Sequence, residues 1–247
     1  MQAVRRWKGH RSRSPGRIRP EALAALAGRT EASAPTRTSV YHRPMDATSP
    51  EVTAYILAGG KSTRMGADKA FVMLGGRNTN GRTLLGRALE LARSVTSDVC
   101  IVGDSAKFAP FAPVVEDVFR DCGPLAGIHA ALRASETGLN LILAVDLPFV
   151  APALLQYLIK RASESDAAVT VAKTGGRWQP LCAVYRREFA DAAEQALHSG
   201  RYRIDALFEA GRIQVIGEQE LEAAGFSSNM FRNLNTREEL EDARGLG

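Results

Sequence analysis

The stretch YILAGGKSTRMGADK, residues 55–69, carries the strongest structural signal in this chain of 247 residues. It begins with three apolar residues typical of a buried strand, and the strand signal ends at Gly59 and the glycine beside it. Three cations follow, Lys61, Arg64 and Lys69. Adjacent glycines let backbone N–H groups approach an oxyanion, and the cations can neutralise a polyphosphate. The stretch therefore predicts a strand followed by a loop that binds a nucleotide triphosphate.

The same stretch contains part of a P-loop. Gly60, Lys61 and Ser62 match the end of the motif G-x-x-x-x-G-K-[ST], which also follows a strand. That motif begins with a glycine five positions before Gly60, where this chain has Tyr55. Because the first glycine opens the phosphate-binding turn, the mismatch disfavours a P-loop NTPase.

Apolar runs alternate with helical patterns along the rest of the chain. The expected strands are 52–57, 99–102, 114–115, 139–145, 167–172, 181–185, 213–216 and 231–234. The expected helices are 84–95, 125–134, 151–163, 187–198, 204–210 and 236–244. This βαβ alternation predicts an α/β fold in which a mostly parallel sheet lies between two helical layers within one domain. In such sheets ligands bind beyond the carboxyl ends of the strands, where the loop after the first strand would lie.

The beginning of the chain differs in composition from the rest. Residues 1–45 have a net charge of +8, whereas the remaining residues have a net charge of −3. We therefore expect a basic leader over residues 1–50, which lacks the material for a core, and a folded domain over residues 51–247. A disordered tail, an organelle transit peptide and translated upstream sequence all stay open for the leader. We favour the third because Met45 lies just before the first strand.

Composition disfavours several classes of protein. The basic charge is confined to the leader, so the slightly acidic domain is not expected to bind nucleic acid. No apolar run reaches the roughly 20 residues that a membrane span needs. The three cysteines form no C-x-x-C pair, which favours buried thiols in a reducing cytosol over disulfides or zinc ligands. We expect a cytoplasmic monomer with no membrane contact.

Two acidic residues follow predicted strands. Asp146 lies in NLILAVDLP, residues 140–148, where five of the six residues before it are apolar. A carboxylate there is well placed for Mg²⁺, which binds through one or two carboxylates together with substrate phosphates. The alternative is an Asp that caps the following helix. Asp117 follows the short strand at 114–115 and is either a ligand-binding residue or a solvated loop acid.

Two further stretches carry signals of a helix start. GPLAGI, residues 123–128, could present the free N–H groups of a helix N-terminus to an anion, although a tight turn at Gly123 explains the same residues. NLNTREEL, residues 233–240, places Asn235 or Thr236 before two acids in the first helical turn. Capping accounts for most of this second pattern.

Together these stretches resemble the molybdenum cofactor guanylyltransferases, a MobA-like nucleotidyltransferase family. The family signature L-x-G-G-x-x-x-R-M-G-x-D-K is filled at every motif position within residues 57–69. The resemblance covers roughly residues 52–244, and it includes the order and spacing of the other three stretches. It implies a three-layer α/β/α domain with a Rossmann-like nucleotidyltransferase sheet.

The resemblance also implies roles for individual residues. Those implied to bind GTP are Leu57, Ala58, Gly59, Lys69, Asp117 and Asp146. Those implied to be catalytic are Arg64, Lys69 and Asp146, with Asp146 as the Mg²⁺ ligand. Asn233 and Asn235 correspond to the pterin side of the cleft.

The chain departs from the family pattern at three places. Arg237 stands where a proline is usual, which weakens the match around the two asparagines. Val102 occupies a position where family members can have Asn, so that contact is not carried over. Residues 78–82, NTNGR, look like an insertion, which we expect to be a longer surface loop near the site.

The reaction implied by the resemblance is transfer of GMP from GTP to the terminal phosphate of molybdenum-molybdopterin, with release of pyrophosphate. The attacking phosphate is already ionised at neutral pH because its second pKa lies near 6. No general base is needed, which fits the lack of a Ser-His-Asp or Cys-His pattern. Mg²⁺ on Asp146, with Lys69 and Arg64, would neutralise charge on the leaving group. Cofactor-biosynthesis proteins or recipient molybdoenzymes could be transient partners.

Three alternatives stay open. Cytidylyltransferase relatives share a similar loop but typically have alanine where Gly59 stands, so this glycine favours guanine over cytosine. Sugar-phosphate nucleotidyltransferases share the L-A-G-G start but fit the continuation at residues 64–69 less well. A nucleotide-binding regulator without turnover is disfavoured because Lys69 and Asp146 are both retained.

Overall fold

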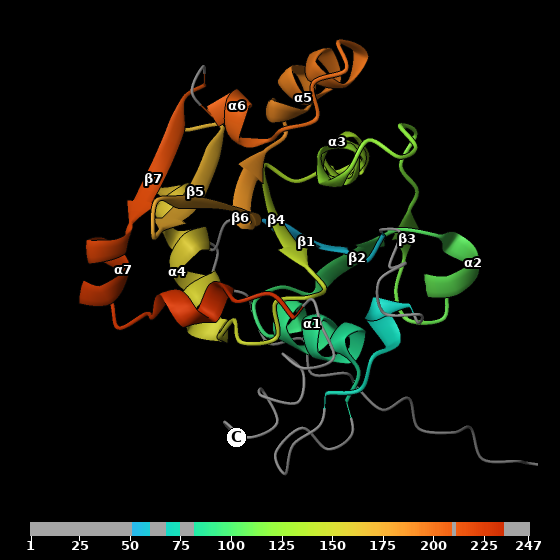
Figure 1. Cartoon of the computed structure of the whole chain (residues 1–247), viewed down its shortest axis with the longest axis horizontal. Helices are drawn as coiled ribbons and strands as arrows, with labels where there is room; N and C mark the ends of the chain where they lie inside the picture. Colours follow the sequence, from blue (N-terminus) through green and yellow to red (C-terminus); the bar gives the residue numbers. More distant parts are fainter. Residues whose placement is uncertain (1–50, 60–67, 75–81, 209–210, 235–247) are drawn as a thin grey trace, which may run out of the picture. The chain divides into compact units, whose positions relative to one another are not determined.

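A computed structural model describes residues 51–59, 68–74, 82–208 and 211–234. Within these residues seven strands form one sheet in the order β3-β2-β1-β4-β6-β5-β7 (Figure 1). The strands are β1 Val52–Leu57, β2 Asp98–Val102, β3 Val114–Val115, β4 Leu139–Ala144, β5 Val169–Thr174, β6 Arg177–Arg186 and β7 Ile213–Gly217. Pairing is parallel except along β6, which runs antiparallel to both β4 and β5. The predicted mostly parallel α/β sheet is confirmed.

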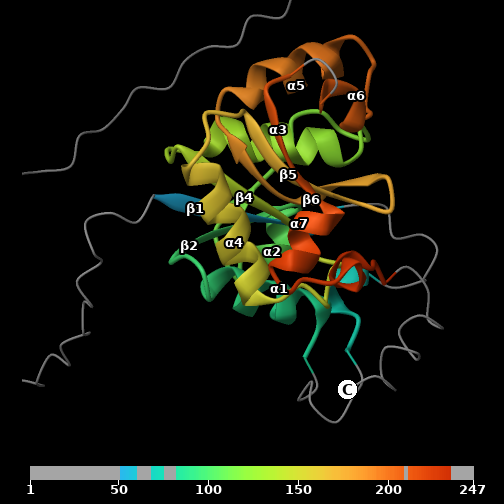
Figure 2. The same cartoon turned by 90° about the vertical axis from the view of Figure 1, so that its left-hand side faces the viewer.

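Helices cover both faces of the sheet, which gives the expected three layers (Figure 1, Figure 2). The α-helices are α1 Leu84–Arg93, α2 Ser105–Phe108, α3 Pro124–Ala134, α4 Pro152–Ser163, α5 Phe189–His198, α6 Asp205–Phe208 and α7 Glu218–Ala223. The 3-10 helices are η1 Lys69–Phe71 and η2 Ser228–Phe231. Apolar residues of α1, α2, α4 and α7 form one core with the sheet, and those of α3, α5 and α6 form the other.

The central strand β1 shows why two cores arise. All six of its residues are buried. Ala54 and Ile56 belong to the core beneath α1 and α4, whereas Tyr55 and Leu57 belong to the core beneath α3 and α5. Successive side chains of a strand point to opposite faces, so a continuous apolar run is the pattern of a strand covered on both sides.

The element boundaries mostly agree with the sequence predictions, with one wrong assignment. The strand expected at 231–234 does not form. Instead Ser227 caps η2 by accepting a hydrogen bond from the Asn229 backbone N–H, and the chain then runs on to a single hydrogen bond at Leu234. The short helices α2 and α7 were not predicted, because elements of four and six residues carry little periodicity. The helix expected at 236–244 lies outside the described residues.

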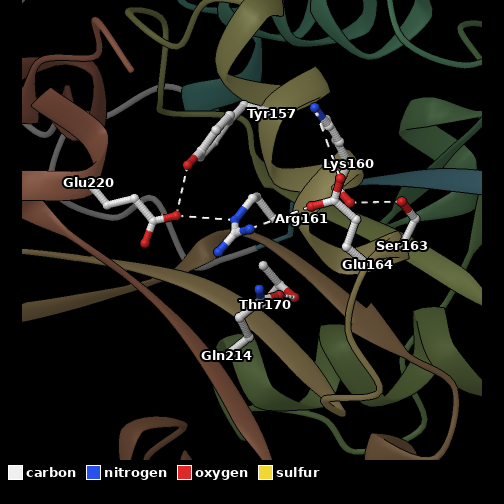
Figure 3. Close-up of polar contacts among 8 residues, drawn as sticks. All are labelled: Tyr157, Lys160, Arg161, Ser163, Glu164, Thr170, Gln214 and Glu220. Carbon is white, nitrogen blue, oxygen red and sulfur yellow. Dashed lines mark hydrogen bonds and ion pairs between the residues drawn. The ribbon is translucent and has the colours of Figure 1, made fainter. Parts of the chain in front are cut away.

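The chain returns from the edge strand β7 towards the middle of the sheet by way of α7, which is attached to α4 by polar side chains (Figure 3). Tyr157 donates its hydroxyl hydrogen to Oε1 of Glu220 at 2.7 Å, and Nε of Arg161 lies 3.1 Å from the same oxygen. The Tyr157 ring also contacts the ring of Phe226 just beyond α7, at 5.4 Å between centroids. These contacts fix the start of the segment that leads to residue 234.

Gly103, directly after β2, is a point of close packing. A Cβ added there would lie 2.8 Å from Cε2 of Phe108, a ring that is 2% exposed. Only the absence of a side chain lets α2 fold back against the end of β2.

We predict that Gly103→Ala lowers the free energy of unfolding by about 1–3 kcal/mol, the usual cost of overpacking a core. Urea denaturation would measure the loss. Gly138→Ala is the matched control, because an added Cβ there meets no atom within 4 Å. Equal stability of the two variants would contradict the packing argument.

An ionic and aromatic cluster joins α3 to α5. The buried side chain of His129 places Nε2 at 3.8 Å from Oε2 of Glu194, and Nε2 of His198 lies 3.9 Å from the other oxygen. Arg133 pairs with Glu194 and with Asp191. Burial lowers the pKa of His129 below its ordinary value of 6.5, although Glu194 acts in the opposite direction. His129 therefore has a structural role between α3 and α5.

The lowered pKa of His129 predicts a pH dependence of stability. Below pH 6.5 the unfolded chain takes up a proton here that the folded protein resists. This contribution to the free energy of unfolding is therefore complete above pH 6.5 and is lost as the pH falls towards the folded-state pKa. Urea titrations at pH 7.5 and 5.5 should show a smaller loss in His129→Gln than in the unaltered protein. An identical loss in both proteins would refute the assignment.

The remaining sequence predictions concern composition and ends. Cys182 is buried and burial raises its pKa to about 12, whereas Cys100 and Cys122 are only half-buried, so the expectation of buried thiols holds for one of the three. Among the described helices none is long and apolar enough to cross a membrane. The leader at 1–50 lies outside the described residues, and the division at residue 50, the monomeric state and the cytoplasmic location stay predictions.

Candidate active site

The carboxyl ends of four adjacent strands lie in one row. The sheet register aligns Leu57 of β1 with Val102 of β2 on one side and with Ala144 of β4 on the other, and it aligns Val102 with Val115 of β3. Backbone hydrogen bonds continue the ladder just past this row, including Val145 N–H to the Leu57 carbonyl at 3.2 Å. Residues that follow these four strands therefore emerge at one edge of the sheet.

Three of the predicted site residues each follow the last residue of a strand by two positions: Asp117 after β3, Gly59 after β1 and Asp146 after β4. Asp104 holds the equivalent position after β2, but its carboxylate caps α2 by accepting a hydrogen bond from Ala106 N–H at 2.9 Å. Asp104 is therefore a helix-capping residue. No capping hydrogen bond from Asp146 is found at α4, where Ala151 is the N-cap residue.

Asp146 pairs with Lys69. Nζ of Lys69 lies 2.7 Å from Oδ2 of Asp146, and the two side chains are only 17% and 19% exposed. The other carboxylate oxygen, Oδ1, is buried without a hydrogen-bond partner among the described residues. The structure thus brings together two of the three residues predicted to be catalytic, 77 positions apart in the chain.

Three local contacts place Lys69 at this edge. Asp68 caps η1 by accepting a hydrogen bond from Ala70 N–H at 3.2 Å, and its other oxygen pairs with Lys107 of α2 at 3.1 Å. Ala70 is fully buried, and the Phe71 ring stacks on the buried Phe108 at 5.8 Å between centroids. The D-K-A-F sequence therefore holds the start of η1 between the core and α2.

The donor set at Asp146 fits a magnesium ion bound with a nucleotide. A buried carboxylate oxygen that lacks a hydrogen donor is a suitable ligand for a hard cation. The described residues contain no group of three or more His, Cys, Asp or Glu side chains that could hold a metal by themselves. Mg²⁺ does not need such a group, because it usually takes one or two carboxylates and completes its shell with water and substrate phosphates.

Asp117 is separated from Asp146 by the width of three strand spacings, about 14 Å at about 4.8 Å each. The two carboxylates cannot share one ion at that separation. Asp117 is half-buried, and its neighbour Glu116 accepts a hydrogen bond from Ser105 N–H at 2.9 Å. The distance suits contacts with opposite ends of one extended ligand.

Helix α3 begins without a side-chain cap at its N-terminus. Gly123 is the N-cap at φ +71 and supplies no side-chain cap, and Pro124 occupies the first helical turn. A Cβ on Gly127 would lie 3.3 Å from Cδ2 of Leu57, so this glycine allows α3 to lie close against the end of β1. The predicted tight turn at Gly123 is present and leaves the helix N-terminus without a side-chain cap, whereas anion binding by its N–H groups stays a prediction.

The segment after η2 also reaches Asp146. Leu234 donates its backbone N–H to the Asp146 carbonyl at 3.1 Å, and the Arg232 guanidinium lies 5.8 Å from the centre of the Phe149 ring. Asn233, between them, is exposed. The predicted pterin-side residue Asn233 is thus next to the predicted metal ligand.

Some predicted features cannot be placed. Arg64 and Asn235 lie outside the described residues, as do residues 78–81 of the insertion. Its last residue, Arg82, is held by Leu74, whose backbone N–H donates to the Arg82 carbonyl at 2.7 Å. Ala58 and Gly59 lie at the edge as predicted, and Ala58 N–H donates to the Val102 carbonyl at 3.1 Å.

Sequence reasoning missed the hairpin of β5 and β6 at this edge. Because β6 runs antiparallel, it starts where the other strands end and brings Trp178 and Gln179 to the carboxyl edge. Lys173 lies with Nζ 4.5 Å from the Trp178 ring centre, and Gln179 donates to the Thr174 hydroxyl at 3.1 Å. The sequence does show Trp178 just after a pair of glycines that could form a turn. It does not show that β6 runs antiparallel, and only this direction brings Trp178 to the carboxyl edge.

A mostly parallel sheet whose first strand ends in a glycine loop, with a lysine–aspartate pair at the same edge, is the arrangement of an α/β nucleotidyltransferase. Residues 54–214 match the family described as the MobA-like NTP transferase domain. The chain belongs to this family, and the protein is a nucleotidyltransferase.

Individual relatives agree with this membership. The molybdenum cofactor guanylyltransferase of Desulfosudis oleivorans is 37% identical over 78% of this chain and 94% of its own length. The protein of that name from Syntrophotalea carbinolica is 31% identical over 79% of this chain and 91% of its own. The crystal structure of molybdopterin-guanine dinucleotide biosynthesis protein A from Archaeoglobus fulgidus superposes with a TM-score of 0.68 at 28% identity, covering 78% of this chain and 97% of that one.

Proposed function

We propose that this protein transfers GMP from GTP to the terminal phosphate of molybdenum-molybdopterin, forming molybdopterin guanine dinucleotide and pyrophosphate. Family membership and relatives named guanylyltransferase support the reaction. The observation that carries the site assignment is the Lys69–Asp146 pair at the carboxyl edge of β4, with a carboxylate oxygen buried and unpartnered among the described residues.

The roles of the residues follow from their order along the sheet edge. GTP would lie across the ends of the strands, with its nucleoside near Asp117 and its triphosphate near Gly59 and Asp146. The backbone of Leu57, Ala58 and Gly59 would lie along the nucleotide, where the lack of a Cβ on Gly59 allows close approach. The uncapped N-terminus of α3 would add N–H donors to the bound anion.

The acceptor side lies at the opposite end of this arrangement. Asn233 is held next to Asp146 by the Leu234 hydrogen bond, so a molybdopterin phosphate bound there would face the α-phosphorus of GTP. Asn235 and Arg64, two further residues proposed to contribute, are nearby in sequence to Leu234 and Lys69. Alignment of two anions that repel each other is the main task of such a site.

The chemical step needs no proton acceptor. An oxygen of the ionised molybdopterin phosphate forms a bond to the α-phosphorus of GTP, and the bond to the β-phosphate oxygen breaks with release of pyrophosphate. Lys69 would neutralise charge on the leaving group after separating from Asp146. Asp146 would hold Mg²⁺, which supplies further charge neutralisation when bound with the nucleotide.

The cellular setting proposed for this reaction follows the sequence predictions. The protein would act as a cytoplasmic monomer on its two substrates, with transient contact to cofactor-biosynthesis proteins or to the molybdoenzymes that receive the product. Sedimentation with and without substrates would test the monomeric state, and a stable dimer would contradict it.

Pyrophosphate release by the full chain tests the proposal directly. The assay contains Mg²⁺ and molybdenum-loaded molybdopterin and compares GTP, CTP and ATP in parallel. We expect turnover selective for GTP. Selectivity for CTP would assign the protein to the cytidylyl branch, and silence with all three nucleotides would refute the proposed reaction.

A further inference from the structure

The loop from β3 to α3, residues 116–123, carries Asp117 and has an unusual backbone. Asp121 has φ +60 and Gly123 has φ +71, both in the left-handed region that ordinary side chains rarely adopt. Aspartate is one of the few residues that tolerate this conformation. Such a loop needs contacts from outside to keep one shape, and these contacts identify what holds Asp117 in place.

Phe119 is the apolar anchor of this loop. Its ring meets the ring of His129 on α3 at 5.2 Å between centroids and 79° between planes, and the ring of His198 on α5 at 5.1 Å and 82°. Both contacts are edge-to-face, the arrangement that aromatic pairs prefer. Phe119 therefore lies between two helices that belong to the rigid body of the domain, two residues after Asp117.

The two histidines lie beside the same carboxylate. Both Nε2 atoms lie within 3.9 Å of a carboxylate oxygen of Glu194, and Arg133 pairs with that same carboxylate. Glu194 and His198 lie one turn apart on α5, whereas His129 and Arg133 lie one turn apart on α3. These contacts connect α3 to α5 and thereby fix the positions of the two histidines that the Phe119 ring contacts.

We propose that Phe119 is a positioning residue for the nucleotide: its ring, seated between His129 and His198, fixes the 116–123 loop and thereby sets Asp117 and the N-terminus of α3 towards bound GTP. The inference rests on the proposed function, because it assigns the loop to the nucleotide. The inference also goes beyond that function: it predicts that the Phe119 ring, which does not contact the ligand, controls the affinity for GTP and leaves the affinity for molybdopterin unchanged.

The test compares Phe119→Ala with Phe119→Leu in the full chain. We measure KM for GTP, KM for molybdenum-molybdopterin, kcat and Tm, together with GTP binding by titration calorimetry. Phe119→Ala should raise the KM and Kd for GTP about tenfold, the size expected when two ring contacts are lost. The KM for molybdopterin should stay unchanged. Phe119→Leu should recover part of the GTP affinity, since it keeps apolar bulk in the seat.

Phe226→Ala is the matched control. The Phe226 ring also makes one aromatic contact, with Tyr157 at 5.4 Å between centroids, but it packs against the core on the other face of the sheet and has no part in the 116–123 loop. This variant should keep the GTP affinity of the unaltered protein.

Two results would overturn the inference. One is an unchanged GTP affinity in Phe119→Ala. The other is an equal rise of both KM values in step with a lower Tm, which is the behaviour of a residue that only stabilises the fold. If Phe119→Ala does not fold, the same comparison is made with Phe119→Leu. Failure of the proposed function is distinguishable, because it would appear as no GTP binding in the unaltered protein.

Discussion

Replacing Asp146 by asparagine is expected to abolish metal-dependent turnover while leaving the domain folded. The amide keeps the size of the side chain, and the hydrogen bond from Leu234 is made to the backbone carbonyl, which the change does not touch. What is lost is the negative charge that would bind the metal. Loss of a partner of a metal ligand typically costs about 10–100-fold in affinity or activity, so loss of the ligand should cost more than that.

The measurement is pyrophosphate release over a range of Mg²⁺ concentrations, with Tm recorded for each protein. Asp98→Asn is a suitable control, since Asp98 is an exposed aspartate at the start of β2, at the opposite edge of the same sheet. It should leave turnover unchanged. Near-normal turnover of Asp146→Asn at any Mg²⁺ concentration would remove Asp146 as the metal ligand.

Asp146→Asn also allows a test of GTP binding in the absence of Mg²⁺. In the structure described here the Asp146 carboxylate holds the ammonium group of Lys69, at 2.7 Å. Asparagine removes the negative charge of this carboxylate, which would repel the triphosphate when no cation lies between them. Without Mg²⁺ we therefore expect Asp146→Asn to bind GTP at least as tightly as the unaltered protein, although it cannot turn over. Weaker metal-free binding would mean that Asp146 contributes to the nucleotide site in some other way.

Replacing Lys69 by alanine is expected to weaken GTP binding by about 10- to 100-fold, because a hydrogen bond to a charged group contributes about 1.5–3 kcal/mol and each 1.4 kcal/mol is a factor of ten. Turnover should fall as well, since the charge on the departing pyrophosphate is no longer neutralised. Lys69→Arg keeps the charge but changes its shape, so it should restore binding more than turnover.

Titration calorimetry with GTP and with GDP measures the binding part of this prediction. Lys107→Ala provides the control, because Lys107 pairs with the neighbouring Asp68 but is half exposed and lies on α2. It should change GTP affinity far less than Lys69→Ala. An unchanged GTP affinity in Lys69→Ala would count against the phosphate role.

The position of the candidate site was predictable from sequence where its residues directly follow a strand. Leu57 to Gly59, Asp117 and Asp146 lie at the ends of β1, β3 and β4 as expected, because each follows an apolar run and the carboxyl ends of parallel strands share an edge. The pairing of Asp146 with Lys69 was not predicted, although both residues were. It depends on how η1 packs against α2 and the core, which no local pattern encodes.

Two errors have the same origin. Residues 231–234 were interpreted as a strand, but buried Phe231 ends η2 and buried Leu234 makes one backbone hydrogen bond to Asp146. Phe119 was not recognised at all, because an aromatic residue in a loop has no periodicity. In both cases the structural role of an apolar side chain depends on which residues, distant in the sequence, it packs against.

The sequence by itself determined the α/β class and the two-sided burial of β1, because the spacing of apolar residues acts over a few positions. The nucleotide-binding role of the loop after β1 stays a prediction from the same stretch. Only the tertiary structure decided the antiparallel direction of β6 and the alignment of the strand ends at one edge of the sheet. It also decided the hydrogen bond from Leu234 to Asp146 and the packing of Phe119 between α3 and α5. These features arise from packing between segments tens of residues apart, where burial of apolar surface and pairing of buried polar groups select one arrangement among several that the local pattern allows.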